Sequence, residues 1–480
     1  MRRALLATLM MTFGTPGAFP QPQADSAPEV ARLLAEVIRI DTSNPPGNEA
    51  QVAEFLKKRF DGLGFEIDIL PTPQAGKSHF IARLRGDGSK RPVLLAGHAD
   101  VVGVEREKWS VEPFGGLIKD GYVWGRGAID FKGGLAVFAQ AVIDIARSKR
   151  KLARDIIFLA EADEEGGSYS TRWLAEKHWD KIDCEFALNE GGWIIKNNSG
   201  AVRYVSISTA DKGSISLLLR ARGTSTHSSM PQPDNAIFIL SRALAKISAY
   251  DTKPRLTEST RQFFLTLSET SDEPMRTHFR NLATSRDEAA VAAADRAISR
   301  DTLLHAIMRN TIAPVLLNAG FRGNVIPGSA DATINFRVVP GTTAEELIEE
   351  MKRVIDDSRV EVTVANISSS RAQITPEQAR IRDAERRIAE SPRSGPLYDA
   401  LVKHAGLTYP GAKVTPYLFQ AGTDAAAWRM RGVSVYGIYP YPITAQDLER
   451  MHGNDERVAV DSLVSGLKIV TATLLEVASK

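Results

Sequence analysis

The stretch "DIIFLAEADEEGGS" (Asp155–Ser168) decides the fold class of this 480-residue chain. Its first half is a continuous apolar run, which is typical of a strand buried on both faces. Four acidic residues, Glu161, Asp163, Glu164 and Glu165, crowd the end of that strand, and two glycines follow. A solvated loop would explain this cluster, and so would a metal site that carries its own base. The rest of the chain has to distinguish these interpretations.

Strands and helices alternate on both sides of this stretch. "RPVLLAGHADVV" before it has the continuous apolar run of a second buried strand, and "KGGLAVFAQAVIDIARS" between them has the apolar spacing of a helix. "STRWLAEKHW" after it predicts another helix, and "CEFALNEGG" another strand. This alternation is typical of an α/β fold whose sheet is largely parallel.

A second module interrupts this pattern near Ser206. "GSISLLLRARG" and "DATINFRVVPG" are predicted strands, and "TAEELIEEMKRVIDD" is a predicted amphipathic helix, which together indicate an α+β module. The first pattern returns near Pro396, so the second module is inserted into the first. We therefore expect a catalytic domain in two parts, residues 25–205 and 368–480, an inserted domain over 206–367, and within it an extra helical insertion at about 251–309.

Composition and the N-terminus limit the classes of partner. With 60 basic and 58 acidic residues the net charge is +2, so no large basic field argues for nucleic acid. The single cysteine, Cys184, cannot form an internal disulfide. "MRRALLATLMMTFGTPGAF" has two arginines, a short apolar stretch and then small residues, which predicts a signal peptide over 1–24 and export to the periplasm or medium. Without such a signal the protein would be cytoplasmic. No later segment has 18 unbroken apolar residues, so no stable membrane span is expected.

Histidines and carboxylates follow consecutive predicted strands. The candidates are His98, Asp100, Asp130, Glu164, Glu165, Glu190 and His452. Because ligands of open α/β sheets gather at the carboxyl ends of the strands, these side chains are expected to meet. Two histidines with several carboxylates and no thiolate suit zinc, with cobalt or manganese as alternatives. Five ligands exceed the needs of one catalytic metal and suit two metals that share a carboxylate.

An ordered set of motifs is similar to that of a known family. "GHADVV", "DGYVWGRGAIDFKGG", "EADEEGGS", "LNEGG", "THSSMP", "GNVIP", "FRVVPG" and "AGTDAAAW" together resemble the zinc metallopeptidases that include aminoacylase, glutamate carboxypeptidase and succinyl-diaminopimelate desuccinylase. The resemblance covers nearly everything after about residue 28. It implies a zinc exopeptidase-like catalytic domain, with a mixed, largely parallel sheet flanked by helices. It also implies that the inserted α+β domain serves as a lid and for dimerisation.

The resemblance implies a ligand for each of two zinc ions. His98 and Glu190 would bind one ion, Glu165 and His452 would bind the other, and Asp130 would bridge them. On an extended chain His98 and a carboxylate two residues later point the same way, so Asp100 would orient that imidazole.

The remaining implied roles concern catalysis and substrate. Glu164 would be the general base, and His227, from the lid and in relatives often from a partner subunit, would stabilise the oxyanion. Asn324 would approach the site from the lid as well. Arg337 would hold the substrate carboxylate with its planar fork of donors, and Gly422 would line the pocket.

These residues predict an enzyme that cleaves an amide bond in a small substrate. A metallo-exopeptidase acting on a dipeptide or a C-terminal residue is the first interpretation, and an N-acyl-amino-acid amidohydrolase using the same site is the alternative. Some relatives carry an arginine soon after "GTD", where this chain has three alanines, which leaves the acyl or side-chain preference open. A non-catalytic metal-binding protein would not need Glu164 together with five ligands. A nucleotide binder, suggested by the glycines of "GRGAIDFKGG", would need a P-loop or GxGxxG spacing that this stretch lacks. A homodimer through the inserted domain is the expected assembly.

Overall fold

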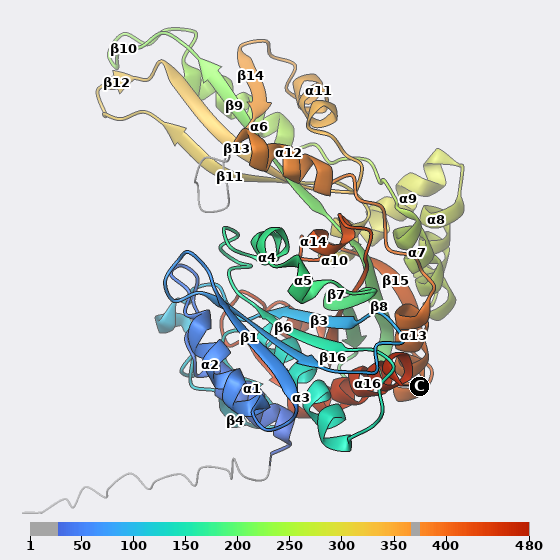
Figure 1. Ribbon diagram of the computed structural model, residues 1–480. Helices are drawn as coiled ribbons and strands as arrows, with labels where there is room; N and C mark the ends of the chain where they lie inside the picture. Colours follow the sequence, from blue (N-terminus) through green and yellow to red (C-terminus); the bar gives the residue numbers. More distant parts are fainter. Residues whose placement is uncertain (1–26, 366–374, 480) are drawn as a thin grey trace, which may run out of the picture.

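The computed structural model describes residues 27–365 and 375–479, which form a large module and a smaller one beside it (Figure 1). The large module is built on an eight-stranded sheet in the order β1-β2-β6-β3-β7-β16-β8-β15. Its strands are β1 (Phe65–Pro71), β2 (Ser78–Leu84), β3 (Val93–His98), β6 (Ile156–Glu161), β7 (Phe186–Lys196), β8 (Val202–Asp211), β15 (Lys413–Phe419) and β16 (Ser434–Ile443). The pairs β3–β6, β3–β7, β7–β16 and β8–β15 are parallel, while β1–β2 and β2–β6 are antiparallel. The predicted mixed, largely parallel sheet flanked by helices is confirmed.

Helices cover both faces of this sheet. One face packs against α1 (Glu29–Ile38), α2 (Glu49–Phe60), α3 (Lys132–Ser148), α13 (Pro396–Thr408) and α16 (Val460–Ala478), and the other against α4 (Thr171–Lys177), α5 (Trp179–Ile182) and α14 (Ala426–Arg429). The apolar sequence of β6 follows from its position between these two layers of helices. Ile156 and Phe158 of β6 enter the first core, whereas Ile157 and Leu159 enter the second. Successive strand residues face opposite sides, so a strand buried on both faces must be apolar throughout.

The smaller elements of the large module lie at its rim. They are a three-stranded sheet of β4 (Leu117–Lys119), β5 (Tyr122–Trp124) and β17 (Arg457–Ala459), and the short helices η2 (Arg106–Lys108) and α15 (Ala445–Leu448).

The inserted module has a core of its own. Its antiparallel sheet has the order β11-β13-β9-β14, from β11 (Thr311–Ala319), β13 (Ser329–Val338), β9 (Gly213–Arg222) and β14 (Val360–Val364). Helices α6 (Ala236–Ser248) and α11 (Ala344–Ile355) pack against this sheet. A short pair of strands, β10 (Thr226–His227) and β12 (Val325–Ile326), forms the outer tip of the module, away from the large sheet (Figure 1). The chain crosses between modules at Lys212, because β8 ends at Asp211 and β9 begins at Gly213, a few residues beyond the boundary expected at 206.

The helical insertion packs on the large module, whereas the sequence placed residues 251–309 within the inserted one. It comprises α7 (Glu258–Thr270), α8 (Met275–Thr284), α9 (Glu288–Ile298) and α10 (Thr302–Ile307). Phe263 of α7 meets Tyr204 and Tyr417 of the large sheet edge-on, with ring centroids 5.4 and 5.2 Å apart. Such aromatic contacts bury large apolar area, which attaches these helices to the edge strand β15.

One further helix, α12 (Pro376–Glu385), follows the inserted module. In the part of the chain that the structure describes, no helix combines the length and apolar character required to cross a membrane. The predicted signal peptide over 1–24 lies outside the described residues and stays a prediction.

Candidate metal centre

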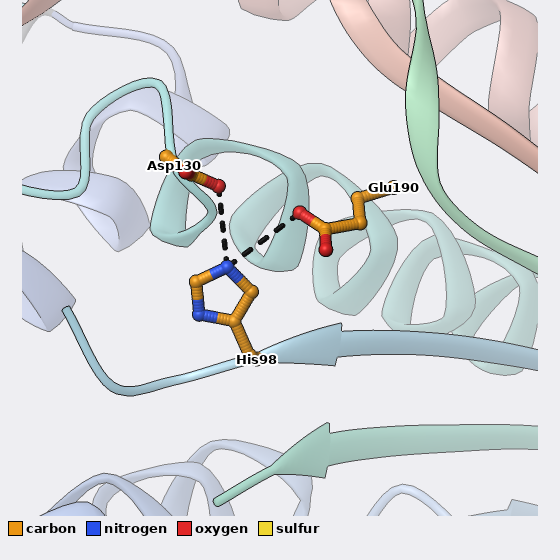
Figure 2. Close-up of side chains that lie close together, drawn as sticks. All are labelled: His98, Asp130 and Glu190. Carbon is orange, nitrogen blue, oxygen red and sulfur yellow. Dashed lines mark hydrogen bonds and ion pairs between the residues drawn. The ribbon is translucent and has the colours of Figure 1, made fainter. Parts of the chain in front are cut away.

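The first metal-ligand group lies where β3 and β7 pass the start of α3. The group consists of His98, Asp130 and Glu190 (Figure 2). His98 Nε2 is 3.2 Å from Asp130 Oδ1 and 3.6 Å from Glu190 Oε2. All three residues are buried. One imidazole nitrogen and two carboxylate oxygens converge on one point, which is a ligand arrangement that zinc and similar divalent ions accept.

The second group shares Asp130 with the first. His452 Nε2 is 2.9 Å from Asp130 Oδ2 and 3.1 Å from Glu165 Oε1. The two oxygens of the Asp130 carboxylate therefore face different groups, one toward His98 and the other toward His452. This is the arrangement that a carboxylate bridging two metal ions requires, and the donor set fits a two-metal site.

The surroundings of the ligand residues raise the pKa of two of them. Hydrogen bonds from His452 to Asp130 and Glu165 raise the pKa of His452 to about 10. Burial raises the pKa of Glu190 to about 7, with the Asp130 charge acting in the same direction. Protons thus compete with metal for these ligands. Because ligands must lose their protons to bind, metal affinity falls as the pH is lowered.

Asp100 supports the first group and the acidic turn together. His98 Nδ1 lies 2.9 Å from the backbone carbonyl oxygen of Asp100, which can only accept, so Nδ1 carries the proton and Nε2 is free for a metal. The Asp100 carboxylate instead accepts the backbone N–H groups of Glu164 and Glu165, at 3.1 and 3.0 Å. The sequence predicted that Asp100 orients His98. The structure adds that it fixes the turn carrying Glu164 and Glu165.

The four acids of the opening stretch have four different surroundings. Glu165 belongs to the second metal group, and Glu164 lies outside both groups and lines the cavity above them. Burial, with the Glu190, Asp424 and Glu165 charges, raises the pKa of Glu164 well above its usual range. Burial and the Asp424 carboxyl do the same to the pKa of Glu161, which is fully buried. Of these acids, Glu164 is the one that lines the cavity without belonging to a metal-ligand group.

Asp163 anchors a buried polar network that the sequence did not reveal. Its carboxylate accepts the backbone N–H groups of Ser168 and Tyr169, at 2.9 and 2.6 Å, and the side-chain amide of Asn44 at 2.8 Å. Lys77 forms a buried ion pair with the same carboxylate. This network closes the loop that follows Glu165. Asn44 was visible in "DTSNPPGNE", but nothing in the sequence linked it to the acidic turn.

Replacing Lys77 by Met should destabilise the protein strongly. The substitution keeps the length of the side chain but leaves Asp163 charged and buried, because both partners are at most 2% exposed. Breaking a buried pair on one side costs about 3–5 kcal/mol of unfolding free energy. Denaturant unfolding measures this cost, with Lys181→Met as the control, since the Lys181–Asp68 pair is over a third exposed and surface pairs contribute about 1 kcal/mol at most. Equal losses in the two variants would contradict the network.

A cavity of about 460 Å³ opens above the metal groups and is lined from both modules. It brings together Glu164, Arg337 from β13 and Gly422 from the loop after β15. His227 and Asn324 do not line it. They lie side by side at the outer tip, where the Ser228 N–H donates to the Asn324 carbonyl oxygen at 3.1 Å, and His227 is exposed.

Several residues of this site carry no motif in the sequence. Tyr439 of β16 donates its hydroxyl toward Asp130 Oδ1 at 2.9 Å and Glu190 Oε2 at 3.1 Å. Arg172 of α4 and Arg382 of α12 line the cavity, and neither belongs to one of the motifs quoted above. A tyrosine in an apolar strand and an arginine in a polar helix are ordinary in composition, so only the fold reveals them.

A mixed α/β sheet with two carboxylate–histidine groups at its strand ends and a free carboxylate beside them defines a metallohydrolase. Comparison with known proteins makes this specific. The family model described as peptidase family M20/M25/M40 matches residues 94–476. The chain therefore belongs to this family, and it is a hydrolase of the metallopeptidase and amidohydrolase class.

Individual relatives agree with that assignment. "Probable carboxypeptidase S-like 2" of Dictyostelium discoideum is 32% identical over 78% of this chain and 69% of its own length. The human N-fatty-acyl-amino acid synthase/hydrolase PM20D1 is 27% identical over 95% of this chain and 88% of its own length. Among solved structures, the metallo-carboxypeptidase Sso-CP2 of Sulfolobus solfataricus has a TM-score of 0.63 at 18% identity, covering 94% of this chain and 99% of its own. The last similarity concerns the fold.

Proposed function

We propose that the protein is a two-zinc exopeptidase that cleaves an amide bond in a dipeptide or releases a C-terminal residue. The observation that carries this proposal is the position of Glu164. It faces the cavity beside two metal-ligand groups that share Asp130, and it belongs to neither group. Arg337 lines the same cavity without an ion pair to any described residue, so a substrate carboxylate has a partner there.

The chain's own residues supply the proton transfers and the substrate contacts. Two metal ions held by these ligands would lower the pKa of a water toward neutrality and polarise the scissile carbonyl. Glu164 accepts the proton of the attacking water and later donates it to the leaving amine. Arg337 binds the carboxylate of the amino-acid part and thereby fixes the amide relative to Glu164. Gly422 adds no side chain to the cavity wall, which leaves room for the substrate.

An N-acyl-amino-acid amidohydrolase is the second candidate, favoured by the similarity to PM20D1 over almost the full chain. Both reactions break an amide beside a carboxylate and use the same residues. Elemental analysis of purified protein, combined with a screen of dipeptides against N-acyl amino acids, tests both. Close to two zinc equivalents with turnover of dipeptides supports the first proposal. Turnover of N-acyl amino acids alone selects the second, and a fully loaded enzyme that cleaves neither class contradicts both.

We also propose a homodimer formed through the inserted module. Strand β11 is an edge strand whose only described partner in the sheet is β13. It exposes Val315 and Leu317, which are 54% and 68% accessible, and Phe321 beyond its end is 77% accessible. An exposed apolar edge strand is a template for pairing with another chain, and a second copy would cover it. The exposed His227 on the same module could then reach a partner's cavity.

His227→Ala should lower kcat by on the order of 10²–10³-fold while metal content stays unchanged. One lost oxyanion donor costs about this much. Metal content should not change, because His227 belongs to neither ligand group and its strand β10 lies at the outer tip of the inserted module (Figure 1). Steady-state kinetics and elemental analysis measure the two effects.

Mixing His227→Ala with Glu164→Gln subunits tests the arrangement across the dimer. If His227 serves the partner, each mixed dimer contains one intact site, and activity rises above that of either parent. If exchange of subunits is demonstrated and no activity returns, His227 does not act across the interface. His278→Ala is a matched control, because that histidine lies on α8 outside both the cavity and the tip.

A further inference from the structure

Helix α12 contributes charges rather than core to the protein. None of its residues is buried, and it begins at a capping box in which Thr375 and Gln378 satisfy each other's backbone N–H groups. Arg382, Glu385 and the following Arg386 nevertheless line the cavity above the metal groups. A helix without buried residues gains little from hydrophobic packing. The specific feature of α12 is therefore the set of charged side chains that it presents to the cavity.

Contacts with both modules hold α12 in place. Glu385 Oε1 accepts hydrogen bonds from Arg172 Nε and Nη2 of α4, at 2.9 and 2.6 Å. The Gly341 N–H, after β13 of the inserted module, donates to the carbonyl oxygen of Arg386 at 2.9 Å. The side chain of Arg386 pairs with Asp383 at 3.0 Å. Arg172 and Arg386 thus each have an acidic partner, whereas Arg382 has none among the described residues.

Arg382 is a half-buried cation without an acidic partner. Its guanidinium forms neither an ion pair nor a hydrogen bond with any described residue. The adjacent residues 366–374 include no aspartate or glutamate. Burial and the neighbouring Arg172 and Arg386 charges lower the pKa of Arg382, against an opposing effect of Glu385. A cation in such surroundings would be stabilised by an incoming anion.

Arg382 and Arg337 line the cavity from different elements. Arg337 belongs to β13 of the inserted module, whereas Arg382 belongs to α12, which is tied to Arg172 of α4 through Glu385. One free guanidinium matches the single carboxylate of a simple amino acid. The second guanidinium would be neutralised by a second anionic group of the substrate.

We infer that Arg382 selects substrates that carry a second carboxylate in addition to the one held by Arg337. This inference rests on the proposed function, since it concerns the substrate of that same cavity. The carboxylate can belong to a dicarboxylic acyl group or to an acidic amino-acid side chain, and both offer the same planar group to the guanidinium.

Matched pairs of substrates that differ only in this charge test the inference. One arm compares N-succinyl-alanine with its terminal carboxamide, and the other compares N-acetyl-glutamate with N-acetyl-glutamine. The metal-loaded enzyme should favour a carboxylate by about 10- to 100-fold in kcat/KM in at least one arm, and the arm identifies its source. Arg382→Gln should reduce that ratio to near one. Arg380→Gln on the same helix should keep it, because Arg380 is 78% exposed and pairs with Glu377.

Binding to the metal-loaded Glu164→Gln enzyme, measured by calorimetry with the same four compounds, makes the result independent of turnover. Tighter binding of the carboxylate form, abolished by Arg382→Gln, supports the inference. Equal affinities within both pairs, or a preference that survives Arg382→Gln, overturn it. If the wild-type enzyme cleaves no amide at all, the proposed function fails, and calorimetry still decides the role of Arg382.

Discussion

Glu164→Gln should abolish nearly all turnover and leave both metal ions in place. The amide has the shape of the carboxylate but cannot accept the proton of water, and base catalysis is worth about 10²–10⁴-fold. Metal retention follows from the position of Glu164 outside both ligand groups. Measurements of kcat/KM and of bound metal on the same preparation check the two expectations.

A matched control exists on the neighbouring helix. Glu176 of α4 is exposed and lies outside the cavity, so Glu176→Gln should behave as the wild type. Loss of metal from a correctly folded Glu164→Gln protein would make Glu164 a ligand. Undiminished turnover would assign the base to another residue.

Asp130→Asn should have the largest effect on metal content. The Asp130 carboxylate faces His98 with one oxygen and His452 with the other, so its charge serves both groups. An amide offers one weaker oxygen and cannot bridge. Metal affinity should fall by more than about 10²-fold, which exceeds the range for residues that only support ligands. Activity should fall with it, because the two-metal chemistry needs both ions.

Tyr439→Phe is the control that separates bridging from support. The Tyr439 hydroxyl contacts Asp130 and Glu190 without belonging to either ligand group. Its loss should weaken metal binding by about 10- to 100-fold and leave the stoichiometry at saturation unchanged. If Asp130→Asn still binds two ions as tightly as Tyr439→Phe does, the shared-carboxylate arrangement is wrong.

The sequence predicted the parts of this protein in which local pattern and tertiary role coincide. The strand before Glu161 is apolar because both of its faces are covered, and polar residues after it are placed by the direction of the strand. Strand direction places His98 in this way, whereas Asp130 precedes α3 and Glu190 lies within β7, so their meeting with His98 depends on the tertiary fold. The roles given to His227 and Asn324 came from the resemblance alone and stay predictions.

Other features depend on contacts that no local pattern encodes. The segment around Phe263 is polar and helical, as expected of an insertion on the lid, yet its partners are Tyr204 and Tyr417 of the large sheet. The ion pair of Lys77 with Asp163 joins residues with no shared motif. Arg382 lies in a helix whose composition indicates only a solvated surface. Each of these contacts depends on which distant segment of the chain packs against the residue. The periodicity of the local sequence does not contain this information.

The position of β16 has a consequence for the synthesis of the protein. This strand begins at Ser434 but lies between β7 and β8, which both end before Lys212. A ribosome must therefore release nearly the whole chain before the large sheet can be completed. Until then the backbone of β7 from Phe186 to Gly192 lacks its later neighbour, and unpaired strand edges favour aggregation. Nascent chains that stop before Ser434 should accordingly depend on chaperones to stay soluble.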